Sequence, residues 1–79
     1  MNKDLIYVVK DLPVAAYLKY MDIKLIAPYD KTRGAWLFDN ASGRCEEYEL
    51  AVRNDEAIIS VAKYEATRKN ILGMAHKIV

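Results

Sequence analysis

The stretch from Lys24 to Asp39 constrains the fold more than any other part of this 79-residue chain. Two apolar segments, KLIAPY and AWLFD, flank the polar loop DKTRG, which ends in Gly34. Apolar runs joined by a short glycine-containing loop are typical of a β-hairpin whose loop is longer than two residues. Trp36 and Phe38 share one face of the second strand. Pro28 lacks an amide donor, so it belongs at a strand end or on a sheet edge.

The segment before the hairpin predicts a strand followed by a helix. LIYVV, residues 5–9, is short, apolar and rich in β-branched and aromatic residues, which is typical of a strand covered on both faces. Asp11 is a favourable N-cap and Pro13 is tolerated in a first turn, so we expect a helix over Leu12–Met21. Asp22 falls where a helix often ends in a left-handed residue. The apolar side of this helix carries Val14, Tyr17, Leu18 and Met21.

Two further helices are expected after the hairpin. Asn40 and Ser42 are candidate capping residues for a short helix over Gly43–Arg53. The apolar side of this helix carries Cys45, Tyr48 and Val52. Leu50 lies nearly opposite that side, so it is either exposed or in contact with a partner.

The segment NDEAIIS leaves two alternatives open. Either Asp55 caps one long helix that runs to Lys77, or Ile58 and Ile59 are extended and Ser60 caps a shorter helix. Two adjacent β-branched residues before a serine favour the second alternative, with the isoleucine side chains held against the core.

These elements predict a single α+β domain over residues 1–79, with the order strand, helix, hairpin and two C-terminal helices. The helices are expected to pack on one side of a small mixed sheet of about three strands. With 53% hydrophobic and 29% charged residues, the composition is that of a folded globular domain. A chain this short buries only about 60% of the surface that its unfolded form exposes, so a partner or a second copy would help its core.

Charge and cysteine content argue against several classes of protein. Twelve Lys plus Arg against eleven Asp plus Glu give a formal charge of +1, far from the excess of a dedicated nucleic-acid-binding domain. The lone cysteine, Cys45, cannot form an intramolecular disulfide. The N-terminal apolar run is too short for a signal peptide, and no apolar stretch approaches the ~20 residues of a membrane span. We therefore expect a soluble, cytoplasmic protein.

The order of motifs resembles a known family. VVKDLPVAAYLKYMDIKLI, the aromatic pair in WLFD, and YEATRKNI are similar to segments of a family of uncharacterised short proteins encoded by phages, bacteria and archaea, often near mobile elements. This chain has Val9 where that family has Thr, and Asp22 where it commonly has Gly. The resemblance implies a phage or mobile-element origin and no known activity. The pattern is carried by Asp11, Leu12, Ala15, Leu18, Trp36, Phe38, Tyr64 and Arg68.

Arg68 falls in the middle of the apolar stripe of the C-terminal helix, where a leucine would be expected. An arginine cannot lose its charge to escape burial. In one interpretation its methylenes pack on the core while the guanidinium pairs with a carboxylate of Asp11, Asp39 or Glu49, or with free carbonyls at a helix end. In the other, Arg68 is exposed in a shallow groove beside Tyr64 and contacts a phosphate or an acidic partner.

Basic and aromatic side chains provide the remaining candidates. Lys63 lies with Asn70 and Lys77 on the opposite side of the C-terminal helix, and Lys69 and His76 lie on a flank. This side is either a solvated face or a surface that follows phosphates. Among the six tyrosines, the best candidates for exposed contacts are Tyr20 and Tyr29.

The sequence predicts no catalytic site, no metal site and no cofactor. It has one His, one Cys on an apolar side and no glycine-rich phosphate loop, while Glu46 and Glu47 point to different sides of a helix. We predict a non-enzymatic binding module for a protein partner, which is a host protein or a second copy. The alternatives are a nucleic-acid regulator that uses the basic C-terminal helix and a self-assembling structural subunit with Leu50, Trp36 or a tyrosine in its interface. The tentative partner-binding residues are Arg68, Tyr64, Lys69, Lys63, Tyr20 and Tyr29.

Overall fold

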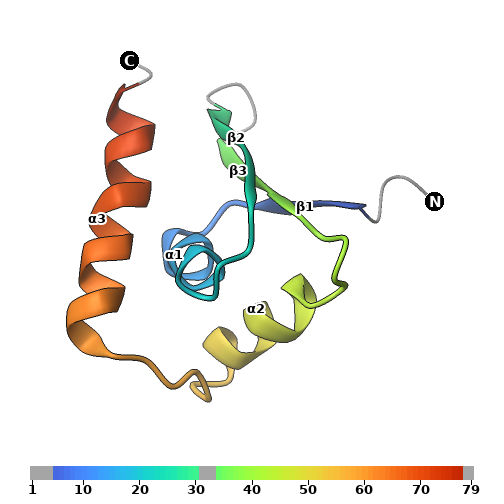
Figure 1. Cartoon of the computed structure of the whole chain (residues 1–79), viewed down its shortest axis with the longest axis vertical. Helices are drawn as coiled ribbons and strands as arrows, with labels where there is room; N and C mark the ends of the chain where they lie inside the picture. Colours follow the sequence, from blue (N-terminus) through green and yellow to red (C-terminus); the bar gives the residue numbers. More distant parts are fainter. Residues whose placement is uncertain (1–4, 31–33, 78–79) are drawn as a thin grey trace.

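The computed structural model describes residues 5–30 and 34–77, with the backbone alone described for residues 27–30 and 74–77. The elements follow the predicted order (Figure 1). The first helix ends one residue earlier than predicted, and the second begins at Cys45 rather than Gly43. The bounds are β1 Ile6–Val9, α1 Leu12–Tyr20, β2 Leu25–Asp30, β3 Ala35–Asp39, α2 Cys45–Arg53 and α3 Val61–Lys77.

The three strands form an antiparallel sheet in the order β1-β3-β2. The prediction of a mixed sheet is therefore wrong. β1 and β2 run in the same direction, but β3 lies between them and is antiparallel to both. This register places Val9 opposite Trp36 and Tyr7 opposite Phe38, so that large apolar side chains gather on one face of the sheet.

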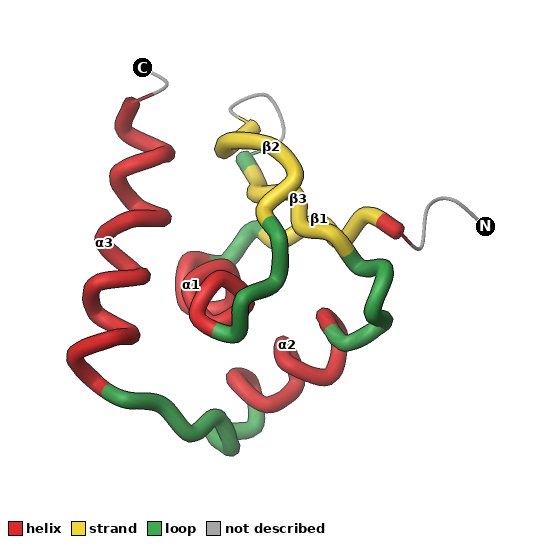
Figure 2. The backbone as a smooth tube through the Cα atoms, in the orientation of Figure 1, coloured by secondary structure: helices red, strands yellow, loops and turns green. Residues whose placement is uncertain are grey.

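The three helices lie on one side of the sheet, as predicted (Figure 2). α1 is the central helix, because it packs against α2, α3 and β1. The two C-terminal helices reach the sheet mainly through α1 rather than directly, although α3 also touches β2. The core that these elements share contains Val9, Val14, Ala15, Leu18, Trp36, Phe38, Cys45 and Ile71.

Two helices end in an aspartate that adopts the left-handed conformation. Asp22 has a φ of 65° after α1, as its position in the sequence predicted, and Asp55 has a φ of 58° after α2. After α1 the amide of Asp22 donates to the carbonyl of Lys19 and that of Ile23 to the carbonyl of Leu18. These two bonds make up a Schellman motif, which satisfies carbonyls at the end of the helix and turns the chain.

Asn40 and Ser42, predicted as capping residues, accept hydrogen bonds at the start of α2, but the N-cap position itself is Arg44, whose side chain makes no capping bond. The amide of Cys45 donates to Asn40 Oδ1 at 3.2 Å, and the amide of Arg44 donates to Ser42 Oγ at 3.3 Å. Helix starts leave amides without intrahelical partners, and these side chains accept from two of them. Glu46 and Glu47 lie in the first turn of α2, where negative charge is favoured by the helix dipole.

Residues 56–60 are not helical, so the shorter alternative for the C-terminal helix is confirmed. Ile58, however, is 88% exposed, and the expectation that both isoleucines are held in the core is wrong. A hydrogen bond instead attaches this segment to α1, because the amide of Ser60 donates to the hydroxyl oxygen of Tyr20 at 2.8 Å. The carbonyl of Ser60 then accepts from the amide of Tyr64 in the first turn of α3.

Candidate functional surfaces

The face of the sheet that points away from the helices is apolar and uncovered in the described part of the chain (Figure 1). Ile6 and Val8 of β1 are 47% and 45% exposed, and Ile26 of β2 is 44% exposed. Val8 lies directly opposite Leu37 of β3, so these side chains share the same face. We call Ile6, Val8, Ile26 and Leu37 the outer sheet face.

The sequence predicted that the strand LIYVV is covered on both faces, but the described residues cover only the face toward the helices. Val9 is buried and Tyr7 half-buried on the helix side, while Ile6 and Val8 remain exposed on the other. An antiparallel sheet with one solvated face normally places polar residues there. An exposed apolar patch is more typical of a contact site, so the outer sheet face is the first candidate surface.

A network of charged and hydroxyl groups joins β1, α1 and α2. Arg53 of α2 pairs with Asp11 and Glu49, each with an N–O distance of 2.7 Å. The hydroxyl of Tyr7 donates to Glu49. Burial raises the pKa of Tyr7, and the hydrogen bond to Glu49 raises it further. Arg53 is not among the site residues predicted from the sequence, although the four-residue spacing between Glu49 and Arg53 is typical of a helical ion pair.

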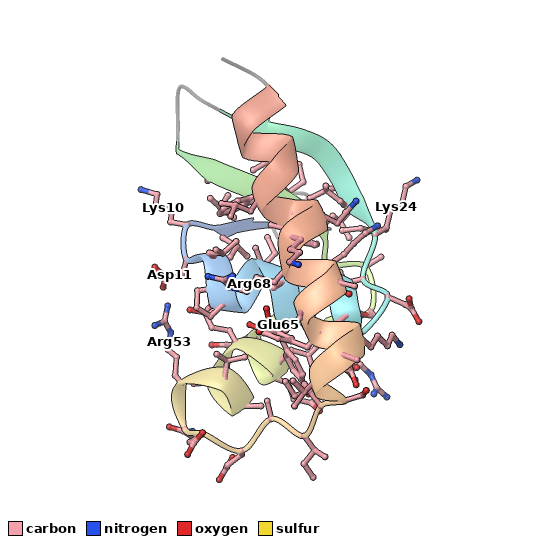
Figure 3. All side chains as sticks on the ribbon, turned by 90° about the vertical axis from the view of Figure 1, so that its left-hand side faces the viewer. Lys10, Asp11, Lys24, Arg53, Glu65 and Arg68 are labelled. Atoms are coloured by element: carbon pink, nitrogen blue, oxygen red, sulfur yellow. The ribbon has the colours of Figure 1, made fainter. Side chains whose placement is uncertain are left out.

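Arg68 has no ion pair or hydrogen bond among the described residues. The carboxylates predicted to pair with Arg68 have other partners. Asp11 and Glu49 form ion pairs with Arg53, and Asp39 accepts a hydrogen bond from the amide of Ala41. Within the described residues, the guanidinium of Arg68 therefore has none of the three carboxylate partners that the first interpretation names. Its side chain is half-buried and leaves α3 on the side where Asp11 and Arg53 lie (Figure 3).

Tyr64 lies close to Arg68 and holds α3 against α1. Its hydroxyl donates to the carbonyl of Pro13 at 3.3 Å. Burial raises the pKa of Tyr64, while the charge of Arg68 opposes that shift. The second interpretation of Arg68, as a contact residue beside Tyr64, agrees with this arrangement.

Tyr20 is part of an aromatic cluster and is not the freely exposed ring that the sequence predicted. Its ring stacks on that of Tyr17 with centroids 6.0 Å apart and meets the edge of Tyr64 at 6.3 Å. The ammonium of Lys63 lies 4.6 Å from the centroid of the Tyr20 ring. Packing of α1 against α3 explains why this ring is half-buried. The side chain of Tyr29 lies outside the described residues.

The structure brings two of the candidate lysines together. Lys19 of α1 and Lys63 of α3 line one open hollow, together with Asp22, Ala66, Thr67 and Asn70. Lys69 is exposed but does not line this hollow. The side chains of His76 and Lys77 lie outside the described part of the chain. The basic surface is therefore shared by α1 and α3 rather than confined to the last helix.

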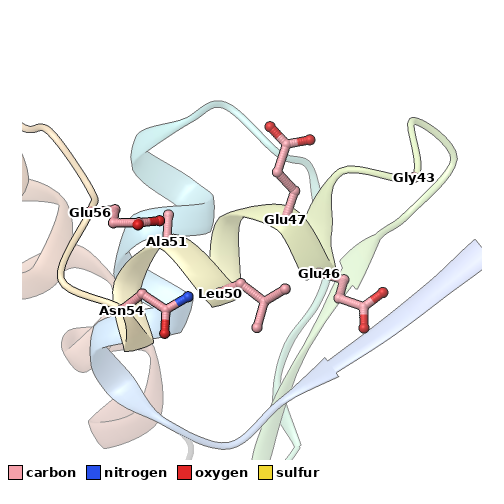
Figure 4. Close-up of a pocket in the computed structure, with 7 residues that line it drawn as sticks. All are labelled: Gly43, Glu46, Glu47, Leu50, Ala51, Asn54 and Glu56. Carbon is pink, nitrogen blue, oxygen red and sulfur yellow. The ribbon is translucent and has the colours of Figure 1, made fainter.

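The outer side of α2 is acidic and surrounds one exposed leucine (Figure 4). Glu46 and Glu47 point to different sides of α2, as predicted, and Leu50 between them is 51% exposed. Glu56 from the following segment also lines this hollow. Negative charge of this kind repels phosphates, so the α2 side does not suit nucleic acid.

The described residues hold no cluster of three metal-ligating side chains. Cys45 is fully buried, and burial raises the pKa of its thiol, which disfavours the reactive thiolate. Trp36 is also buried, so it does not belong to an exposed interface.

Comparison of the chain with protein-family models, with curated proteins and with solved structures finds no match. Within residues 5–30 and 34–77, no helix combines the length and the apolar character needed to cross a bilayer. The case for a function therefore depends on the surfaces described above.

Proposed function

We propose that this protein is a non-enzymatic module that binds another protein through the outer sheet face. The observation that supports the proposal is the exposure of Ile6, Val8 and Ile26 on a sheet whose opposite face carries all three helices. Contact surfaces are depleted of charge at their centres, and Val8 and Leu37 at the centre of this face match that composition, while Asp39 lies opposite Ile6 at its end. The resemblance described above would place such a module among the accessory proteins of a phage or mobile element.

The energy available from this face favours a weak and reversible contact. Fully burying a Val, Leu or Ile side chain is worth about 1.5–3 kcal/mol, so covering the exposed half of each is worth about 1 kcal/mol. The exposed side chains of the outer sheet face together then contribute about 3–4 kcal/mol. Association itself costs an estimated 4–15 kcal/mol, so the partner must add apolar surface or hydrogen bonds of its own.

Photo-cross-linking in the cells that produce the protein would test this proposal. We expect a photoreactive amino acid at Val8 or Ile26 to give discrete protein adducts, because these positions lie within the contact surface. The same residue at Glu47, on the acidic outer side of α2, is the matched exposed control and is expected to give none. Absence of adducts from both Val8 and Ile26 would contradict the proposal.

The second candidate function is nucleic-acid binding, and the hollow shared by Lys19 and Lys63 favours it. We expect no saturable binding of short labelled DNA or RNA at about 50 mM salt if the outer sheet face is the functional surface. Binding that is lost at about 200 mM salt and weakened by Lys63→Glu would instead identify a phosphate-contacting surface. Glu47→Gln serves as the control, because it also changes charge but lies on α2.

A further inference from the structure

A small hollow opens between α1, the end of α2 and the segment that leads into α3. Its volume is about 210 Å³, which is below the roughly 300–1,000 Å³ of pockets for drug-sized ligands and therefore suits a compact chemical group. In the segment after α2, Ala57 and Ile59 line the hollow, whereas Ile58 between them is 88% exposed. The described lining residues are Tyr17, Val52, Asp55, Ala57, Ile59 and Tyr64.

Two tyrosine rings, from α1 and α3, form part of the wall of this hollow. Tyr17 is only 7% exposed, and its hydroxyl makes no hydrogen bond within the described part of the chain. Tyr64 is held in place because its hydroxyl donates to the carbonyl of Pro13. The bond between the amide of Ser60 and the hydroxyl of Tyr20 fixes the segment that closes the hollow. The wall is therefore in position without a ligand.

The aromatic cluster beside the hollow already contacts an ammonium group of the chain itself. Lys63 Nζ lies 4.6 Å from the centroid of the Tyr20 ring, and this ring stacks on that of Tyr17. A cation within about 6 Å of a ring centroid is attracted by the negative face of the ring. The chain thus makes, one ring away from the hollow, the kind of contact that an ammonium ligand would make inside it.

A carboxylate gives the hollow a negative charge. Asp55 is exposed, and its carboxylate has neither an ion pair nor a hydrogen bond to any described residue. Burial raises the pKa of Tyr64, and the charges of Arg68 and Glu65 then shift it in opposite directions. The charges of α3 therefore partly cancel at this ring. Among the described residues that line the hollow, Asp55 alone is charged.

We propose that this hollow binds a quaternary ammonium group, with its methyl groups against Tyr17 and Tyr64 and its charge near Asp55. Aromatic rings with apolar neighbours are the surroundings in which proteins recognise choline and methylated lysine. The group is either free, as in choline, or carried by a trimethylated lysine of another protein. Because the hollow lies among the helices, this inference does not depend on the function proposed for the outer sheet face.

A titration with choline chloride, followed by amide NMR shifts at constant ionic strength, tests the inference. We expect saturable shifts at Asp55, Ala57 and Ile59 with a Kd on the order of 1–30 mM, the range for a ligand of about seven non-hydrogen atoms. The neutral isostere of choline, in which carbon replaces the quaternary nitrogen, should bind at least about threefold more weakly. Equal affinity for this isostere, or no shift at these amides up to about 100 mM choline, would overturn the proposal.

Two aspartates in the same backbone conformation provide matched variants. Asp55→Asn removes the charge of the hollow and keeps a residue that readily adopts the left-handed conformation. We therefore expect the fold to persist and choline to bind about two- to fivefold more weakly, as for loss of an exposed charge pair. Asp22→Asn makes the same change at a φ of 65° outside the hollow and should leave binding unchanged. Equal weakening in both variants would indicate an effect of net charge and would overturn the site.

A short peptide with one trimethylated lysine separates the two sources of the ammonium group. Binding at least about tenfold tighter than that of choline would support the site and identify a protein ligand, because flanking residues add contacts. Binding no tighter than that of choline would support the site and identify a free ammonium ion. The same peptide with unmodified lysine is the control and should bind more weakly, because a lysine ammonium is more strongly hydrated. Equal binding of the two peptides would overturn recognition of the methyl groups.

Discussion

Leu18→Ala is expected to lower the free energy of unfolding by about 2–5 kcal/mol, the range for leucine removed from a packed core. Leu18 is fully buried on α1, the helix that contacts both other helices. Truncation would leave a cavity that cannot collapse easily, because α1 is packed against α2, α3 and β1. A domain of 79 residues is expected to have only about 4–12 kcal/mol of stability in total, so this one change removes a large part of it.

Leu50→Ala is the matched control for this prediction. It makes the same chemical change inside a helix, but Leu50 is 51% exposed on α2. A change at an exposed position away from caps and pairs usually alters stability by about 0.5 kcal/mol or less. Thermal and urea unfolding of both variants would measure the difference, which corresponds to roughly 10–30 °C in Tm for a domain of this size. Equal effects of the two substitutions would contradict the central position of α1.

Local patterns predicted the elements of the fold because local interactions determine them. The apolar run of β1, the N-terminal position of Pro13 and the left-handed Asp22 each depend on a few neighbouring residues. The strand order depends on which strands bury the same face, and this involves residues about thirty positions apart. The mixed sheet was predicted wrongly for that reason, since nothing near β1 in the sequence indicates that Trp36 and Phe38 lie beside it.

Side-chain partners were harder to predict than elements. The helical wheel correctly marked Arg68 as unusual, but it could not show that Arg53 binds both Asp11 and Glu49. One of these two bonds joins α2 to the segment before α1, and such a contact follows from tertiary packing alone. The ion pair between Arg53 and Glu49 could have been predicted, because the two residues lie four positions apart in a predicted helix.

The candidate surface was also partly visible in the sequence. LIYVV is apolar at every position, whereas a strand with one solvated face alternates with polar residues. That pattern predicted cover on both faces, and within residues 5–30 and 34–77 the structure covers the helix side alone. The difference between the pattern and the fold is the strongest argument for a partner, because it identifies which side of the sheet that partner would occupy.

Alkaline pH is expected to lower the free energy of unfolding of this protein. Burial raises the pKa of Tyr7, Tyr17 and Tyr64, and it also raises that of the Cys45 thiol. For each group the unfolded chain therefore loses its proton at a lower pH than the folded chain. The folded state then binds more protons than the unfolded state, so the free energy of unfolding falls as pH increases. The loss begins near the ordinary pKa values, about 8.5 for Cys and about 10 for Tyr.

Urea unfolding between about pH 8 and pH 11.5 would measure this loss, whose slope reaches about 1.4 kcal/mol per pH unit for each proton that differs. Tyr17→Phe should flatten the slope with little effect near pH 8, because among the described residues no hydrogen bond involves the Tyr17 hydroxyl. Tyr7→Phe should flatten it too, but it should also cost about 1 kcal/mol near pH 8, because the hydrogen bond to Glu49 is lost. The stability curves of Tyr7→Phe and the unmodified chain should therefore converge as pH rises. Parallel curves would show that Tyr7 ionises equally easily in the folded and unfolded chain, and the network that joins β1 to α2 would then not protect its hydroxyl.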